Sequence, residues 1–242
     1  MDIDTKQVKN DTLPTEKPKN INQYKKWLEK QFDIQITNKI QNYYEHVLSK
    51  INNIFKKDPL WEELNKNLKE YHNEYRLSTG YHLFMNAENP EKPELLEKPF
   101  SSFLIKTYRK NILNNKNWPN SPKDGWILPD NWFSEIKDMV RTAYTVKYLD
   151  GVEFVVNKIK NLSEKYNLKI EVEYEAREEG YYAAHVCINR KFEIPKIDYD
   201  TKTVGAWVEI QITTQLQDVI KKLLHKYYEK RRKEVDRRYE KW

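Results

Sequence analysis

The stretch W-V-E-I-Q-I-T, residues 207–213, decides the fold because it alternates apolar and polar side chains as a β-strand does. Successive strand side chains point to opposite faces of a sheet, so its valine and two isoleucines share one face and predict a core contact. Glu209 and Gln211 share the other face. A carboxylate beside an amide indicates a polar cleft, in which a Glu could bind a metal ion or act as a base. A solvent-facing polar strand shows the same pattern, so alternation alone leaves both interpretations open.

The segments on either side of this strand predict an α+β fold. Residues 169–175 also alternate strictly, and residues 141–148 and 181–192 are further strand candidates. Apolar residues recur every three or four positions in residues 40–54 and 151–166, as on one face of a helix. We therefore expect a mixed sheet of about four or five strands with helices before and after it. Three further helices are expected, at residues 60–75, from a cap at Ser101 or Ser102 to residue 114, and at 132–138. Gly80 can act as a cap after the first of them. Loops are expected at residues 86–99, 115–131 and 193–204.

The chain of 242 residues suits one domain of ordinary size with flanking helices. Residues 1–20 are polar and contain two prolines, which predicts a flexible tail. Residues 21–80 predict an N-terminal helical region. Residues 81–242 then hold the sheet and end in a basic helix, and they are the expected catalytic domain.

Composition excludes several classes of protein. An aromatic content of 13% can build a core, which argues against a disordered chain. Only 5 glycines are present and no glycine-rich phosphate-loop motif occurs. Cys187 is the only cysteine, which excludes an internal disulfide framework and a multi-cysteine metal site. Without an apolar run of roughly 20 residues or a signal peptide, we expect a cytoplasmic protein with no membrane partner.

The net charge of +6 is concentrated at the C-terminal end. Residues 219–242 hold ten Lys or Arg and four Asp or Glu, so the preceding part of the chain is neutral overall. A basic helix on a neutral body can bind nucleic acid or an acidic partner. The same composition fits a solvated helix with pairs such as Glu229–Lys233 and Glu234–Arg238.

Two other positions are candidates for chemistry. Asp138 lies between an expected short helix and an expected strand, a common place for a metal-binding carboxylate, although from this position alone a helix-end or turn Asp is the favoured interpretation. Tyr181 opens a strand after a charged turn, where an exposed aromatic ring can stack on a purine. A Tyr that merely packs on the sheet is the alternative for this position.

Four segments in linear order resemble the pyrophosphokinase domain of the RelA/SpoT family. E-G-Y-Y-A-A-H-V (179–186), followed by V-E-I-Q-I-T-T (208–214) and a helix with His225, is similar to the family's G-Y-x-S-x-H and E-I-Q-I-R-T segments. Upstream, residues 98–109 are similar to its K-x-x-x-S-I-x-x-K-x-x-R segment, and residues 136–140 to its I-x-D-h-h segment. The resemblance covers roughly residues 60–230, and the order of four motifs makes it more specific than any one of them.

The resemblance implies the RelA/SpoT synthetase fold and transfer of pyrophosphate from ATP to a ribose 3′-hydroxyl, with release of AMP. Asp138 and Glu209 would hold Mg²⁺, and Glu209 would also take the proton of the attacking hydroxyl. Phosphoryl-type transfer depends mainly on positioning and charge neutralisation, which suits this set of side chains. The implied ATP-binding residues are Lys98, Ser102, Lys106, Arg109 and Arg177, and the implied acceptor-binding residues are Tyr181, His185 and Gln211.

The departures from these motifs point to one branch of the family. Ala143 and Thr213 stand where the motifs have arginine, and Ala183 stands where they have serine. The segment D-M-V-R, residues 138–141, is similar to the toxic small alarmone synthetases of toxin–antitoxin pairs. That likeness implies a neutralising antitoxin and, as acceptor, the 3′-terminal adenosine of tRNA, which would block aminoacylation and translation. The expected tRNA-binding residues are Lys221, Lys222, Lys226, Arg231 and Arg232, and no DNA partner is expected.

Two alternatives remain at this stage. An enzyme of the same fold could act on free GDP, GTP or adenosine nucleotides, because its chemistry differs only in the acceptor. A non-catalytic RNA-binding module could keep the fold without activity. The presence of both implied Mg²⁺ carboxylates and of Tyr181 weighs against the second alternative.

Overall fold

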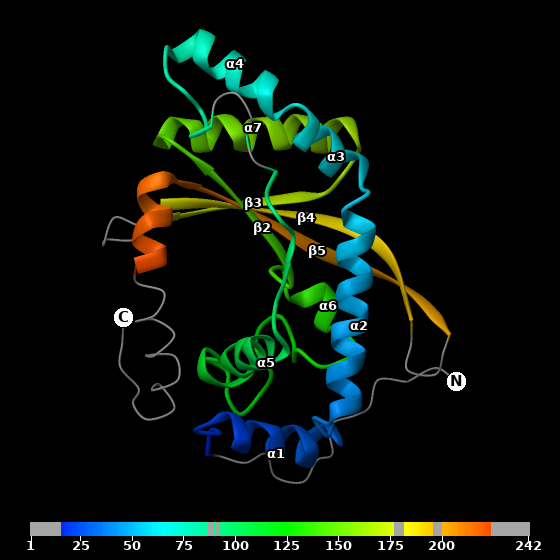
Figure 1. Cartoon of the computed structure of the whole chain (residues 1–242). Helices are drawn as coiled ribbons and strands as arrows, with labels where there is room; N and C mark the ends of the chain where they lie inside the picture. Colours follow the sequence, from blue (N-terminus) through cyan, green and yellow to red (C-terminus); the bar gives the residue numbers. More distant parts are fainter. Residues whose placement is uncertain (1–15, 87–89, 91, 177–181, 196–199, 224–242) are drawn as a thin grey trace. The chain divides into compact units, whose positions relative to one another are not determined.

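The computed structural model describes residues 16–86, 90, 92–176, 182–195 and 200–223 (Figure 1). The described chain divides into two compact units. One unit comprises residues 16–46 and 99–132, and the other comprises residues 47–98 together with the described part of 133–223. Helix α2, Asn38–Phe55, contributes to both units.

The second unit is built on a mixed sheet of five strands, which confirms the predicted α+β class. The order is β1-β2-β5-β4-β3, with β2 and β5 parallel and the other neighbours antiparallel. Non-sequential neighbours make β5 the centre of the sheet, so the stretch with Glu209 lies in its interior. The strands are β1 (Leu96–Glu97), β2 (Val140–Val146), β3 (Ile170–Ala176), β4 (Tyr182–Pro195) and β5 (Thr201–Thr214).

Helix α7, Leu149–Lys165, packs on one face of this sheet (Figure 1). Its buried side chains recur at helical spacing, from Val152 to Leu162, and lie against the apolar face of β2, β4 and β5. Gly151 permits the close approach, because an added Cβ would lie 2.9 Å from Leu83 Cδ1 and 3.4 Å from Val146 Cβ. The opposite face of the sheet is therefore the one that carries Glu209.

The remaining helices of this unit follow local signals. Helix α3, Pro59–Lys66, starts with Pro59 in its first turn and is capped by Asp58, whose carboxylate accepts from the Leu60 amide at 2.9 Å. Helix α4 ends at Gly80, which adopts the left-handed conformation that glycine tolerates best. Helix α4 is Leu68–Thr79 and α6 is Trp132–Glu135.

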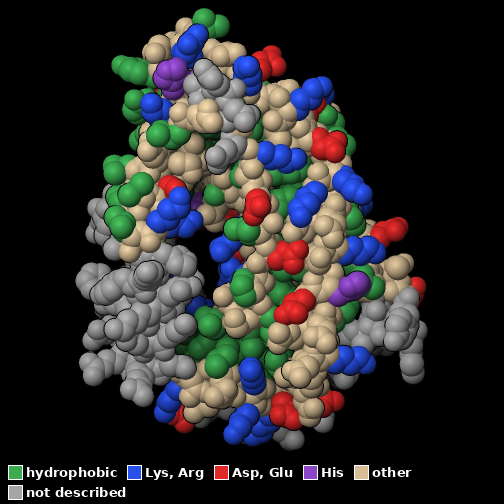
Figure 2. Space-filling view, in the orientation of Figure 1, with side chains coloured by type: hydrophobic (Ala, Val, Ile, Leu, Met, Phe, Trp, Pro, Cys, Tyr) green, Lys and Arg blue, Asp and Glu red, His purple; other side chains and the backbone are tan. Residues whose placement is uncertain are grey.

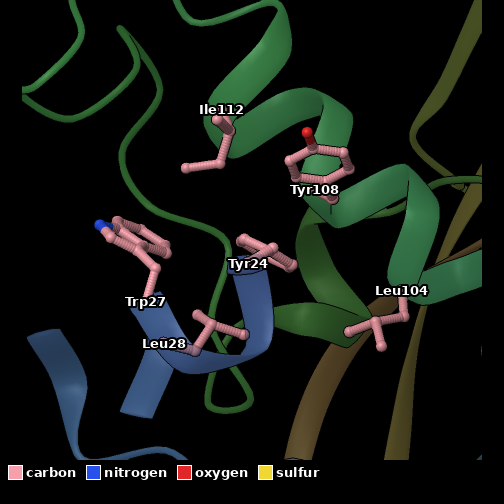
Figure 3. Packing of buried hydrophobic residues seen from close by; sticks show 6 residues of the cluster. All are labelled: Tyr24, Trp27, Leu28, Leu104, Tyr108 and Ile112. Carbon is pink, nitrogen blue, oxygen red and sulfur yellow. The ribbon is translucent and has the colours of Figure 1, made fainter. Parts of the chain in front are cut away.

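The first unit has an aromatic core between α1, Ile21–Phe32, and α5, Phe100–Tyr108. Figure 3 shows this cluster, with Trp27 on α1 and Tyr108 on α5. A π-helical turn, Arg109–Leu113, continues α5. Asn111 in that turn donates from Nδ2 to Tyr24 Oη at 2.8 Å and to the Ile127 carbonyl at 2.9 Å. The cluster consists of Tyr24, Trp27, Leu28, Leu104, Tyr108 and Ile112.

Several predicted boundaries were wrong. The helix expected at residues 60–75 is two helices, which meet at Asn67. The expected loop at 86–99 contains β1. Helix α5 begins at Phe100 with Pro99 at its N-cap position and no side-chain cap, so neither Ser101 nor Ser102 caps it. Strands β4 and β5 extend into the expected loop at 193–204, because they pair with each other beyond the rest of the sheet.

The C-terminal helix is described only in its first part, residues 215–223. Lys226, Arg231 and Arg232 lie outside the described residues, as do Arg177, Tyr181 and His225. Among the residues that are described, none forms a helix with the length and apolar character needed to cross a membrane.

Candidate active site

Strand register brings the polar side chains of four strands onto one face of the sheet. The parallel pairing of β2 with β5 places Arg141 beside Glu209 and Ala143 beside Gln211. The antiparallel pairing of β4 with β5 places His185 beside Gln211. Because directly paired residues point to the same face, these side chains all project away from α7.

Glu209 is the centre of a hydrogen-bonded network on this face. Its Oε1 lies 2.9 Å from His185 Nδ1, and its Oε2 accepts from Gln211 Nε2 at 2.7 Å. His185 Nε2 lies 3.3 Å from Glu175 Oε2 on β3, within ion-pair distance. Glu209 is only 7% exposed. It therefore occupies a buried polar site, which excludes the solvent-facing alternative for this strand.

The network favours the carboxylate form of Glu209 and the imidazolium form of His185. Burial would raise the pKa of Glu209, and the nearby charge of Asp138 would raise it further, but hydrogen bonds from His185 and Gln211 outweigh both and lower it. The hydrogen bond to Glu209 raises the pKa of His185 although burial opposes this. The site thus contains an ionised carboxylate within electrostatic reach of a second one, Asp138.

Asp138 reaches the site from the turn before β2 and pairs with Lys98. Lys98 Nζ donates to Asp138 Oδ2 at 2.7 Å, and the two side chains are 9% and 12% exposed. The Lys98 amide also donates to the Met139 carbonyl at 2.8 Å, which extends the pairing of β1 with β2. A predicted ATP-binding residue and a predicted metal ligand are therefore in direct contact.

The carboxylates suit a hard cation. Mg²⁺ keeps several waters and is usually held by one or two carboxylates together with substrate phosphates. Asp138 and Glu209 fit that donor set, whereas Cys187 beside Glu209 does not, because burial raises the pKa of its thiol to about 12. Within the described ranges, no group of three or more His, Cys, Asp or Glu side chains could by itself hold a metal ion. Phosphate oxygens would have to complete the coordination.

Three other predicted ATP-binding residues belong to the first unit, whereas Arg177 lies outside the described residues. Ser102 and Lys106 lie on α5, and Arg109 begins the π-helical turn that follows it. Lys106 is half-buried and Arg109 is exposed. Lys106 and Arg109 are three positions apart on one continuous helical segment, as their spacing in the sequence predicts.

The described part of the C-terminal helix differs from the expected RNA-binding face. Lys221 Nζ donates to Gln211 Oε1 at 3.2 Å, so its ammonium is directed at the sheet. Lys222 pairs with Asp218 one turn earlier, at 2.7 Å. On the face drawn in Figure 2, basic and acidic side chains of the described residues are interspersed. The roles of these lysines in tRNA binding stay predictions.

Sequence reasoning missed two members of the site. Glu175 is the last glutamate of the alternating strand β3, and that alternation is a signal that places it on the same face as Glu171 and Glu173. Arg141 entered the sequence analysis only as the last residue of the D-M-V-R segment, although the register makes it the neighbour of Glu209.

Several solved structures are similar to this chain. The small alarmone synthetase 1 from Bacillus subtilis bound to its product pppGpp is 18% identical, over 70% of this chain and 75% of that one, with a TM-score of 0.44. A GTP pyrophosphokinase family protein from Streptococcus pneumoniae is 18% identical, over 83% and 85% of the two chains, with a TM-score of 0.42. The small alarmone synthetase 2 from Bacillus subtilis is 19% identical, over 73% and 82%, with a TM-score of 0.39. No protein-family model and no curated protein matches the chain. At these identities and TM-scores, function has to be argued from the residues of this chain.

Proposed function

We propose that this chain is an ATP-dependent pyrophosphokinase that transfers pyrophosphate to the 3′-hydroxyl of the terminal adenosine of tRNA. The observation that carries the proposal is the buried, ionised Glu209 on a polar sheet face, within electrostatic reach of the buried Asp138 in the turn before β2. Two carboxylates beside a buried Lys98 form a site for a cation and phosphates.

The reaction balances with the residues of this site. The oxygen of the ribose 3′-hydroxyl bonds to the β-phosphorus of ATP, the bond from that phosphorus to the bridging α–β oxygen breaks, and AMP leaves. Glu209 takes the hydroxyl proton, while the hydrogen bonds from His185 and Gln211 keep its carboxylate oriented. Bound Mg²⁺ would supply charge neutralisation for the phosphates, held by Asp138 and Glu209.

Lys98 contributes a positive charge to the same place. In the free protein its ammonium is satisfied by Asp138. With ATP bound, this ammonium could pair with a phosphate oxygen, and Asp138 would then be available as a ligand for Mg²⁺. This exchange of partners keeps both buried charges compensated throughout the reaction, as buried ions require.

A free nucleotide is the second candidate acceptor, and one observation favours it. Of the two described lysines of the expected RNA-binding face, Lys221 is directed at Gln211 beside Glu209, where a small substrate would bind, and Lys222 is paired with Asp218. The tRNA proposal is supported by the net charge of residues 219–242 and by the motif likeness to the toxic branch.

We also expect a neutralising partner protein, because a chain that stops translation has to be held inactive in its own cell.

Acceptor labelling tests the proposal. The protein is incubated with γ-labelled ATP, Mg²⁺ and either tRNA, tRNA lacking its terminal adenosine, GDP, GTP or AMP. Label on intact tRNA alone supports the first acceptor, and label on a free nucleotide supports the second. Glu209→Gln serves as the inactive control. Glu193→Gln is the matched active control, because Glu193 is an exposed position on the β4–β5 arm, residues 190–195 and 201–206, which pair only with each other. Absence of transfer to every acceptor would contradict the proposed chemistry.

A further inference from the structure

Lys221, on the helix that follows β5, is hydrogen-bonded to a member of the Glu209 network. Residues 215–223 form a helix directly after β5, and this turn of the chain brings Lys221 back over the strand it has just left. Its Nζ donates to Gln211 Oε1 at 3.2 Å, and the Gln211 amide donates to Glu209 at 2.7 Å. One side chain therefore separates this ammonium from the predicted base.

Arg141 approaches the same place from β2. The register puts it directly beside Glu209, and two positions further along β2 the neighbour of Gln211 is Ala143. Ala143 is exposed and has no side chain beyond Cβ. Adjacent strands lie about 5 Å apart, so Arg141 is one strand away from Glu209, and Lys221 contacts Gln211 two positions further along β5.

The electrostatics of Lys221 agree with this geometry. Lys221 is an exposed residue, but desolvation by nearby protein atoms lowers the pKa of its ammonium, and the positive charge of Arg141 lowers it further. Asp218, Glu209 and Glu175 act in the opposite direction without cancelling the effect. An anion placed between the two cations would relieve their repulsion.

We propose that Arg141 and Lys221 together bind one phosphate group of a substrate beside Glu209. Guanidinium and ammonium groups are the preferred side-chain partners of phosphate, and two of them match its charge at neutral pH. Gln211, which contacts Lys221, holds the ammonium in place when the phosphate is absent. This inference rests on the proposed function only in identifying the phosphate as part of ATP or of the acceptor.

The direct test measures anion binding without catalysis. Inorganic pyrophosphate is titrated into the full chain by calorimetry, with Lys221→Met, Arg141→Met and Lys221→Arg as variants. Lys191→Met, an exposed position on the β4–β5 arm, is the matched control. We expect about 10- to 100-fold weaker binding in both Met variants, the range for losing a charge-assisted hydrogen bond, with recovery in Lys221→Arg and no change in the control.

Thermal unfolding separates a binding role from a structural one. Removal of one of two repelling charges should leave the Tm of Lys221→Met unchanged or slightly raised. A lower Tm, wild-type binding in Lys221→Met, or no pyrophosphate binding by the wild-type chain would each overturn the proposal.

Kinetics identifies the source of the phosphate. A raised KM for ATP in Lys221→Met assigns the site to the donor, and a raised KM for the acceptor assigns it to the acceptor. If the wild-type chain transfers label to no acceptor while the variants still lose pyrophosphate binding, the proposed function fails and the phosphate site stands.

Discussion

His185 on β4 and Glu209 on β5 form an ion pair across two adjacent strands, with Nδ1 2.9 Å from Oε1. The two residues are diagonal neighbours, because the register pairs His185 with Gln211 and Glu209 with Cys187. The pair connects a group that titrates near neutral pH to the carboxylate proposed as the catalytic base.

The pair makes stability depend on pH. The hydrogen bond to Glu209 raises the pKa of His185 above 6.5, so its contribution is fully present below pH 6.5 and is lost as the pH rises through the raised value. We expect His185→Gln to be destabilised relative to the wild type at about pH 6, and the difference to shrink at about pH 9. Urea unfolding at both pH values measures this, and a difference that grows with pH would contradict the pairing.

Removal of the Glu209 charge should affect activity more than folding. Glu209→Gln keeps the shape of the side chain but removes the base and one proposed Mg²⁺ ligand. A general base alone contributes about 10²- to 10⁴-fold, so label transfer should fall by at least that factor. The variant should retain a cooperative unfolding transition. Transfer at a near-normal rate would make Glu209 a structural residue.

The Lys98–Asp138 pair should be strongly coupled in stability. Because both side chains are buried, Lys98→Met or Asp138→Asn alone should cost about 3–5 kcal/mol, the usual range for breaking a buried ion pair. The double variant should cost much less than the sum, since neither charge then remains in the site. Unfolding free energies of the four proteins give the coupling, and additive costs would show that the two charges act independently.

Tyr181 lies outside the described residues, and its role in stacking on the acceptor base stays a prediction. Tyr181→Ala should weaken acceptor use by about 1–3 kcal/mol, the contribution of one base–aromatic stack, while ATP binding is retained. Tyr181→Phe is the matched control, since it preserves the ring. Acceptor and ATP titrations measured separately distinguish this from general damage, which would affect both substrates.

The sequence by itself determined the local elements. Alternation in residues 207–213 predicted β5 and its two faces, and helical periodicity predicted α7, because both patterns depend only on residues a few positions apart. The α+β class and four of the five strands followed from such segments. The predictions were wrong for the short strand β1 and for the N-terminal cap of α5. β1 has two residues, and Pro99 rather than a serine precedes α5, so the local signals there were weak or misleading.

Only the tertiary structure decided which side chains meet. His185, Asp138 and Lys98 come from separate segments, and the order β1-β2-β5-β4-β3 that gathers them around Glu209 depends on long-range strand pairing. Lys221 is the clearest case. Composition groups it with the basic C-terminal residues, but the direction in which the helix leaves β5 turns its ammonium toward Gln211. Side-chain direction across a turn of the chain is set by packing against the whole sheet, which no local pattern encodes.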